Sequence, residues 1–144
     1  MNEARILLVE DNEADVDLIR YTFKQNKINN ELIVIGDGEE AVEYLLKKGR
    51  YKDVLLPDII ILDINLPKKN GLEVLKEIKA DEDARIVPVV ILTTSSADRD
   101  ILEAYKNYVN AYLVKPVEIE EFIKVISKME EFMIRIIKKP KLER

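Results

Sequence analysis

Residues that could carry chemistry follow directly after apolar, strand-like runs at four points of this chain. They are Glu10 and Asp11, Asp63, Thr93 and Thr94, and Lys115. If these runs are parallel strands of one sheet, their carboxyl ends share an edge, and Asp11 and Asp63 converge there. The 144 residues contain no histidine and no cysteine, so imidazole, thiolate and disulfide chemistry is excluded. The available chemistry is that of carboxylates, lysine, arginine, tyrosine and hydroxyl groups.

A cluster of Glu10, Asp11 and Asp63 would be destabilised by repulsion between its charges, and a divalent cation would relieve that repulsion. Mg²⁺ suits a site that has only oxygen ligands and keeps some of its waters. Lys115 and the Thr93 hydroxyl could then hold an anionic group beside the cation. Phosphoryl transfer needs this combination, because its catalysis is mostly positioning and charge stabilisation. A carboxylate is the expected nucleophile. Taken singly, each acidic residue could equally be a helix cap.

Composition and charge favour one globular domain. The chain is 47% hydrophobic and 35% charged, and its net charge of -5 argues against nucleic acid as the main partner. Residues 134–144 carry five Lys/Arg and one Glu, and this basic segment is either a solvated helix end or a docking element. We find no signal peptide and no apolar run of the roughly 20 residues that a membrane span needs. A cytoplasmic location is therefore expected.

Apolar runs alternate with amphipathic segments along the whole chain, which predicts an α/β fold of (βα)5 type. The expected strands are Ala4–Val9, Leu32–Ile35, Asp58–Leu62, Pro88–Leu92 and Ala111–Val114. Their nearly continuous Ile, Val and Leu content is typical of strands that are buried on both faces of a parallel sheet. The expected helices are 14–26, 38–49, 70–82, 98–107 and 118–137, with Asn12, Asp37, Asn70 and Asp98 near their starts. The predicted architecture is a doubly wound, flavodoxin-like sheet of strand order 2-1-3-4-5.

Five short motifs resemble the signature of the receiver domain of two-component response regulators. They are Val9-Glu10-Asp11-Asn12, Leu62–Pro67, Asn70-Gly71, Leu92-Thr93-Thr94 and Tyr112–Pro116. The resemblance covers residues 4 to 131, which places a receiver domain at 1–133 and a basic extension at 134–144. The connection 49–57, the stretch 66–71 and the ending Glu130-Glu131-Phe132 are most similar to stand-alone receivers of the cyanobacterial phytochrome response regulator type.

The resemblance implies a phosphoacceptor and a metal site. Asp63 would accept a phosphoryl group from a sensor histidine kinase. Asp11 and Asp63 would bind Mg²⁺ directly, together with the main-chain carbonyl of Asn65, and Glu10 would act through a metal-bound water.

The resemblance also implies residues that contact the phosphoryl group and transmit its presence. Lys115 would pair with the phosphoryl group, and the backbone N–H groups of Asn65 and Thr94 would contact it. Thr93 and Tyr112 would form the switch, and the peptide bond between Lys115 and Pro116 would be cis. Thr94 is bulkier than the small residue common there, which could alter access, and Asn65 and Ser95 should tune the phosphate lifetime.

Three functions remain open from the residues. The first is a single-domain response regulator, which catalyses only its own phosphorylation and slow dephosphorylation and signals through an unknown protein partner. The second is a phosphatase of the haloacid dehalogenase type, which needs a second Asp two residues after the nucleophile, where this chain has Asn65. The third is an adaptor that is never phosphorylated. The intact set of site residues argues against it: Glu10, Asp11, Asp63, Thr93 and Lys115.

The final helix has a wider apolar surface than one core-facing stripe requires. Phe122, Ile123, Ile126, Met133 and Ile137 form the stripe expected to face the sheet. Val125, Phe132 and Ile136 lie on its flank and widen the apolar arc to roughly 200°, where a little over 100° suffices. We expect this flank to be a homodimer interface, together with the fourth helix and fifth strand. The alternative is that the fourth helix covers it.

Overall fold

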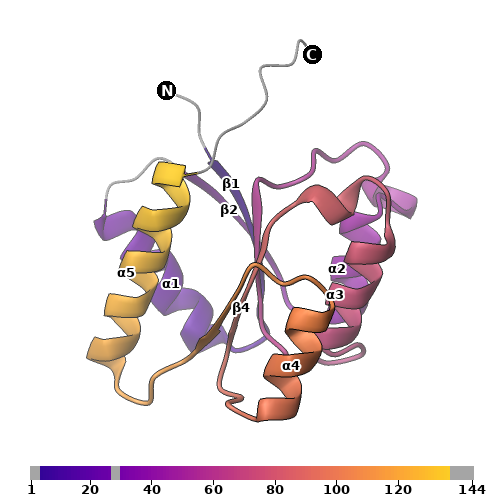
Figure 1. The fold of residues 1–144 in the computed structure, drawn as a ribbon. Coiled ribbons are helices and arrows are strands. Elements are labelled where there is room, and N and C mark those ends of the chain that lie inside the picture. Colours follow the sequence, from indigo (N-terminus) through magenta and orange to yellow (C-terminus); the bar gives the residue numbers. More distant parts are fainter. Residues whose placement is uncertain (1–3, 27–29, 137–144) are drawn as a thin grey trace.

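The computed structural model describes residues 4–26 and 30–136 of the chain, and the side chains of that range as far as Phe132. In these ranges five parallel strands form one sheet in the order β2-β1-β3-β4-β5, which confirms the predicted topology (Figure 1). The strands are β1 (Ala4–Val9), β2 (Asn30–Ile35), β3 (Ile59–Leu62), β4 (Val89–Thr93) and β5 (Ala111–Val114).

Helices cover both faces of the sheet. They are α1 (Glu13–Gln25), α2 (Gly38–Leu45), α3 (Gly71–Ala80), α4 (Asp98–Lys106) and α5 (Ile119–Ile136), with two short 3-10 helices, η1 (Gly49–Tyr51) and η2 (Ala84–Ile86). Figure 1 shows α1 and α5 on one face and α2, α3 and α4 on the other. This is the layering that right-handed crossovers produce in a doubly wound sheet.

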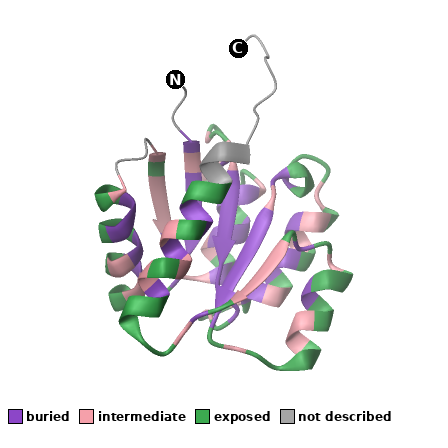
Figure 2. Cartoon of the chain, turned by 60° about the vertical axis from the view of Figure 1, so that its left-hand side comes forward, coloured by how far each residue is buried: buried purple, intermediate pink, exposed green. Residues whose placement is uncertain are grey.

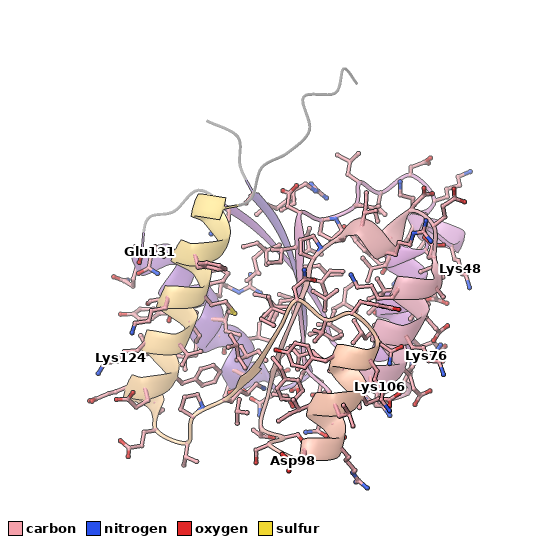
Figure 3. The ribbon with its side chains drawn as sticks, viewed as in Figure 1. Lys48, Lys76, Asp98, Lys106, Lys124 and Glu131 are labelled. Carbon is pink, nitrogen blue, oxygen red and sulfur yellow. The ribbon has the colours of Figure 1, made fainter. Side chains whose placement is uncertain are left out.

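The alternation of side chains along each strand divides the core into two layers. Leu7 and Val9 of β1 face the cluster beneath α2, α3 and α4. Ile6 and Leu8 face the cluster beneath α1 and α5. Five of the six residues of β1 are buried and Arg5 is partly buried, because this strand has a neighbour on each side. Figure 2 shows buried residues concentrated in the sheet and exposed residues on the outer surfaces of the helices. Charged side chains such as Lys76 and Lys124 point away from the sheet on opposite sides (Figure 3).

The two edge strands depart from the expectation that every apolar run is buried on both faces. Most residues of β2 and β5 are only partly buried, and Val114 is exposed. Each of these strands has one neighbour instead of two, so the helix layers cover it less completely. An apolar run therefore predicted the strand correctly but overestimated its burial.

The expected helix starts are confirmed. The side chains of Asn12, Asp37 and Asn70 accept backbone N–H groups at the starts of α1, α2 and α3. Asp98 is the first residue of α4, as expected, and Ala97 precedes it without a side-chain cap. Helix α2 ends earlier than the expected position 49. Lys47 has a φ of 56°, and Lys48 N–H bonds the Glu43 carbonyl, which closes the helix without a glycine.

Helix α5 buries Phe122 and Ile126 as expected, but Met129 and Glu130 complete its inner face. Val125 packs partly against the core cluster of α1, while Phe132 is 62% exposed. Among the described side chains of this flank, the fourth helix does not cover Val125 or Phe132, since its buried Ala104 belongs to the cluster on the opposite face of the sheet. The structure does not describe the side chains of Met133 and Ile136. Ile137 and the extension to residue 144 also lie outside the described residues.

Glu130 anchors α5 to the far end of α1 and the start of β2. Its carboxylate accepts hydrogen bonds from Asn26 Nδ2 at 2.8 Å and from Asn30 Nδ2 at 2.7 Å, and the residue has no exposed surface. Burial raises the pKa of Glu130 to about 7, and the two amide donors only partly offset this. The folded protein therefore holds the Glu130 proton to a higher pH than an exposed glutamate would.

A raised pKa in the folded state predicts stability that is full below pH 4.5, the ordinary value for a glutamate, and lost as pH rises through about 7. Glu130→Gln keeps an acceptor oxygen but removes the titration. Between pH 4.5 and 8 the metal-free wild type should lose on the order of 1–3 kcal/mol of unfolding free energy relative to Glu130→Gln. Urea unfolding at each pH measures this difference, and a constant difference across the range would contradict the assignment.

Candidate functional site

Strand register brings the expected site residues together at the carboxyl edge of the sheet. Val9 of β1 lies opposite Leu62 of β3. The Asp63 N–H bonds the Val9 carbonyl at 3.0 Å, and the Glu10 N–H bonds the Ile35 carbonyl at 3.0 Å. The residue after each strand is thus held by the neighbouring strand, which places Glu10 and Asp63 side by side.

Three carboxylates converge at this edge, as the sequence predicted for Glu10, Asp11 and Asp63. One oxygen of each lies within 4.8 Å of the others. Glu10 and Asp63 are buried at 2% and 6% exposure, whereas Asp11 is open to solvent. An oxygen-only cluster with one open side fits a hard divalent cation that keeps part of its water shell.

Lys115 provides the positive charge of the site. Its Nζ donates to Glu10 Oε1 at 2.5 Å, to Asp15 Oδ2 at 2.8 Å and to Asp63 Oδ2 at 3.0 Å. The side chain is 4% exposed, so these contacts are shielded from water. The Lys115 N–H bonds the Thr93 carbonyl at 2.6 Å, which fixes the lysine to the end of β4.

The electrostatics of the site separate its two buried carboxylates. Burial raises the pKa of Glu10 to about 7, helped by the charge of Asp63 and opposed by Lys115. Burial acts on Asp63 in the same direction, but the Thr93 hydroxyl and Lys115 outweigh it and lower the Asp63 pKa. Burial lowers the pKa of Lys115, yet hydrogen bonds to Asp15 and Glu10 leave it raised overall. Of the two buried carboxylates, Asp63 is therefore the one whose ionised form the site favours.

The loop after Asp63 is held in place by two glycines at close contacts. A Cβ on Gly71 would lie 2.0 Å from the Asp63 carbonyl oxygen. A Cβ on Gly38 would lie 1.8 Å from the Lys69 carbonyl oxygen. The Gly71 N–H bonds the Ile64 carbonyl at 2.8 Å, and the Asn65 N–H bonds Asp63 Oδ1 at 3.2 Å. The starts of α2 and α3 thereby support the loop that carries Asp63.

The expected switch residues meet in the loop between β4 and α4. Thr93 is fully buried, and its Oγ1 accepts the Ser95 N–H at 3.4 Å. The Ser95 hydroxyl donates to Asp100 Oδ2 at 2.6 Å, and the hydroxyl of half-buried Tyr112 donates to the Ser95 carbonyl at 3.0 Å. Ser95 therefore links Thr93 to Tyr112. Thr94 and Asn65 are exposed at the rim of the site.

The peptide bond between Lys115 and Pro116 is trans, so the expected cis bond is wrong for this structure. The two isomers at an X–Pro bond differ by only about 0.5–1 kcal/mol, in favour of trans. With the trans bond, Lys115 already reaches Thr93 through its backbone and three carboxylates through its ammonium group.

Asp15 is the site residue that sequence reasoning missed. It lies in the first turn of α1, and the helix begins directly after Glu10 and Asp11 at the same edge of the sheet. Acidic residues are common in the first turn of a helix, because they interact favourably with the helix dipole, so the residue type alone did not indicate a site residue. Only its position, four residues after Asp11, could have indicated that it lies near the site.

This fold and site define the class of protein. The profile of the response regulator receiver domain matches residues 6–127, and the chain belongs to this family. Members are signalling proteins and not enzymes, so the phosphatase alternative is not supported. No helix in the described ranges is both long and apolar enough to cross a membrane.

Two cyanobacterial regulators are similar to this chain over nearly its whole length. The response regulator Rcp1 of Synechocystis sp. is 41% identical over 135 residues, which are 94% of this chain and 92% of that protein. The structure of its Mn²⁺-bound form is 40% identical with a TM-score of 0.90 and covers 95% of this chain and 99% of that one. The structure of the phosphorylated cyanobacterial phytochrome response regulator RcpA is 38% identical in sequence, with a TM-score of 0.92. The match covers 97% of this chain and 100% of that chain. The expected resemblance to this type is confirmed.

Repulsion within the acidic cluster predicts opposite effects of one substitution on stability and on metal binding. Asp11→Ala should raise the metal-free melting temperature, because unit charges about 4 Å apart repel even at an effective dielectric near 20. The same change should weaken Mg²⁺ binding, read from the Mg²⁺ dependence of the melting temperature. Asp53→Ala removes an exposed carboxylate from the connection before β3 and is the control. A metal-free melting temperature that falls in Asp11→Ala would contradict the repulsion argument.

Proposed function

We propose that the protein is a response regulator that accepts a phosphoryl group from a sensor histidine kinase onto Asp63 in a Mg²⁺-dependent reaction. The observation that supports this best is the contact between Lys115 Nζ and Asp63 Oδ2 at 3.0 Å, beside an acidic cluster. This arrangement combines three groups that phosphoryl transfer needs: the Asp63 carboxylate as nucleophile, the Lys115 ammonium for the phosphoryl oxygens, and carboxylate oxygens as ligands for a cation.

The residues present fit a bound Mg²⁺. Asp11 and Asp63 would hold it directly with the Asn65 main-chain carbonyl, and Glu10 would act through a metal-bound water. When bound, the cation neutralises charge on the phosphoryl oxygens and between the carboxylates. The Mn²⁺-bound form of Rcp1 supports a divalent-cation site in this family.

The chain's own groups account for the transfer. An Asp63 carboxylate oxygen attacks phosphorus, the P–N bond to the kinase histidine breaks, and its electron pair leaves with the imidazole. Lys115 stabilises charge on the phosphoryl oxygens. The backbone N–H groups of Asn65 and Thr94, two residues at the rim of the site, would also contact the phosphoryl group. Slow hydrolysis of the acyl phosphate resets the protein.

Phosphorylation would be read through the link from Thr93 to Tyr112. The Thr93 hydroxyl would turn to the phosphoryl group, and the Ser95 segment that it contacts would move with it. The Tyr112 hydroxyl bonds the Ser95 carbonyl, and Tyr112 belongs to β5, which is part of the face formed by α4, β5 and α5. The signal would pass from there to a downstream protein in the cytoplasm.

Asp63 should be the sole phosphorylation site. Incubation with acetyl phosphate and Mg²⁺ should add one phosphoryl group, about 80 Da by intact mass, because Asp63 is the ionised carboxylate beside Lys115. Asp63→Asn should take none, and the control Asp53→Asn should be labelled like wild type. Labelling that persists in Asp63→Asn would contradict the assignment of Asp63 as the phosphoacceptor and would indicate another acceptor residue.

We also propose a two-fold homodimer through the α4–β5–α5 face, with residues 134–144 as a basic extension beyond the domain at 1–133. Exposed apolar side chains gather on these three elements and the turn after β5: Leu102, Tyr105, Val114, Val117, Ile119 and Phe132. A surface of this kind is typical of an interface. Val125 and Ile136 belong to the proposed contact, which phosphorylation would tighten through Tyr112.

Phe132→Glu should give a monomer in light scattering, because it buries a charge in the apolar contact, while Asp63 still takes a phosphoryl group. Leu55→Glu is the matched control, since Leu55 is 56% exposed against 62% for Phe132 and lies in the connection between α2 and β3. Wild-type protein that stays monomeric at high micromolar concentration, with and without phosphorylation, would rule out this interface.

A further inference from the structure

The ammonium group of Lys115 has three hydrogens, and each has a carboxylate acceptor. Two acceptors, Glu10 and Asp63, belong to the acidic cluster, while the third, Asp15, comes from α1 and contributes no oxygen to it. Lys115 is 4% exposed and Asp15 22% exposed, so Asp15 is the partner on the solvent side. The lysine therefore bridges the cluster and the first helix.

The start of α1 leaves the Asp15 carboxylate available for this role. An acidic residue at the third helical position commonly reaches back to the N–H of the cap residue. In this chain the Asn12 N–H bonds Glu10 Oε2 at 3.2 Å instead. Asn12 Oδ1 in turn accepts the Asp15 N–H at 3.0 Å, which fixes the Asp15 backbone while its carboxylate faces Lys115.

Lys115 and a divalent cation draw on the same carboxylates. Lys115 is bonded to Glu10 and Asp63, which are two of the three residues whose oxygens converge within 4.8 Å. A cation that binds these carboxylates withdraws negative charge from them and weakens their bonds to the ammonium. A buried ammonium that lost these partners without a replacement would be costly.

We propose that Asp15 is a positioning residue that retains the Lys115 ammonium at the site while Glu10 and Asp63 turn their oxygens to a divalent cation. This inference rests on the metal-binding part of the proposed function and not on phosphorylation. Asp15 thereby reduces the competition of Lys115 with the cation and keeps the lysine beside Asp63.

The test is a double-mutant cycle on Mg²⁺ affinity, read from the Mg²⁺ dependence of the melting temperature at pH 8. Asp15→Asn preserves shape but removes the charge, so Lys115 should hold Glu10 and Asp63 more tightly, and Mg²⁺ affinity should fall roughly three- to ten-fold. In a Lys115→Met background the competitor is gone, and Asp15→Asn should change affinity by less than about two-fold. Asp15→Glu should restore most of the affinity.

Asp17→Asn is the matched control, because Asp17 is an exposed carboxylate on the same helix, and it should bind Mg²⁺ like wild type. An equal loss of affinity from Asp15→Asn with and without Lys115 would show a general charge effect and overturn the proposal, as would no loss at all. A fall in metal-free stability with unchanged Mg²⁺ affinity would mean that Asp15 only stabilises the helix. A wild type that binds no Mg²⁺ would instead refute the metal site itself, whatever Asp63 does with acetyl phosphate.

Discussion

A buried ammonium group that is shared by carboxylates from three separate elements holds the functional edge of this protein together. Lys115 follows β5, and its partners come from the end of β1, the first turn of α1 and the end of β3. Buried charges are costly unless they are paired, and removal of one partner leaves the others uncompensated. The geometry around Asp63 therefore depends on Lys115 as much as on Asp63 itself.

The backbone brings these charges together before any side chain contributes. The register between β1 and β3 aligns Glu10 with Asp63, and Gly38 and Gly71 let two helix starts approach the loop that follows. At the opposite end of the sheet, Glu130 and its two asparagine donors join α5 to α1 and β2. The layer of α1 and α5 is thus fastened by polar contacts near both ends and by apolar packing between them.

Local sequence signals predicted the elements well and the long-range polar contacts poorly. The runs Ala4–Val9 and Ala111–Val114 matched β1 and β5, because short β-branched and apolar runs between turns favour strands, although β5 is less buried than its run suggests. The length of α2 was overestimated, because Lys47 ends the helix in a left-handed conformation that a lysine does not usually adopt. The contacts of Asp15 and Glu130 were not predicted. Their partners are about a hundred residues away, so only the folded arrangement reveals their role.

The distance along the chain between Lys115 and its partners has a consequence for folding. Glu10 and Lys115 are 105 residues apart, and Asp63 and Lys115 are 52 apart, so the last strand must dock before the charges balance. Contacts of such separation form late, because loop closure costs entropy before it is repaid. Until β5 arrives, Glu10 and Asp63 repel each other without their cationic partner. A nascent or partly unfolded chain thus lacks the charge-balanced site, and the chemistry becomes available only once the whole sheet is complete.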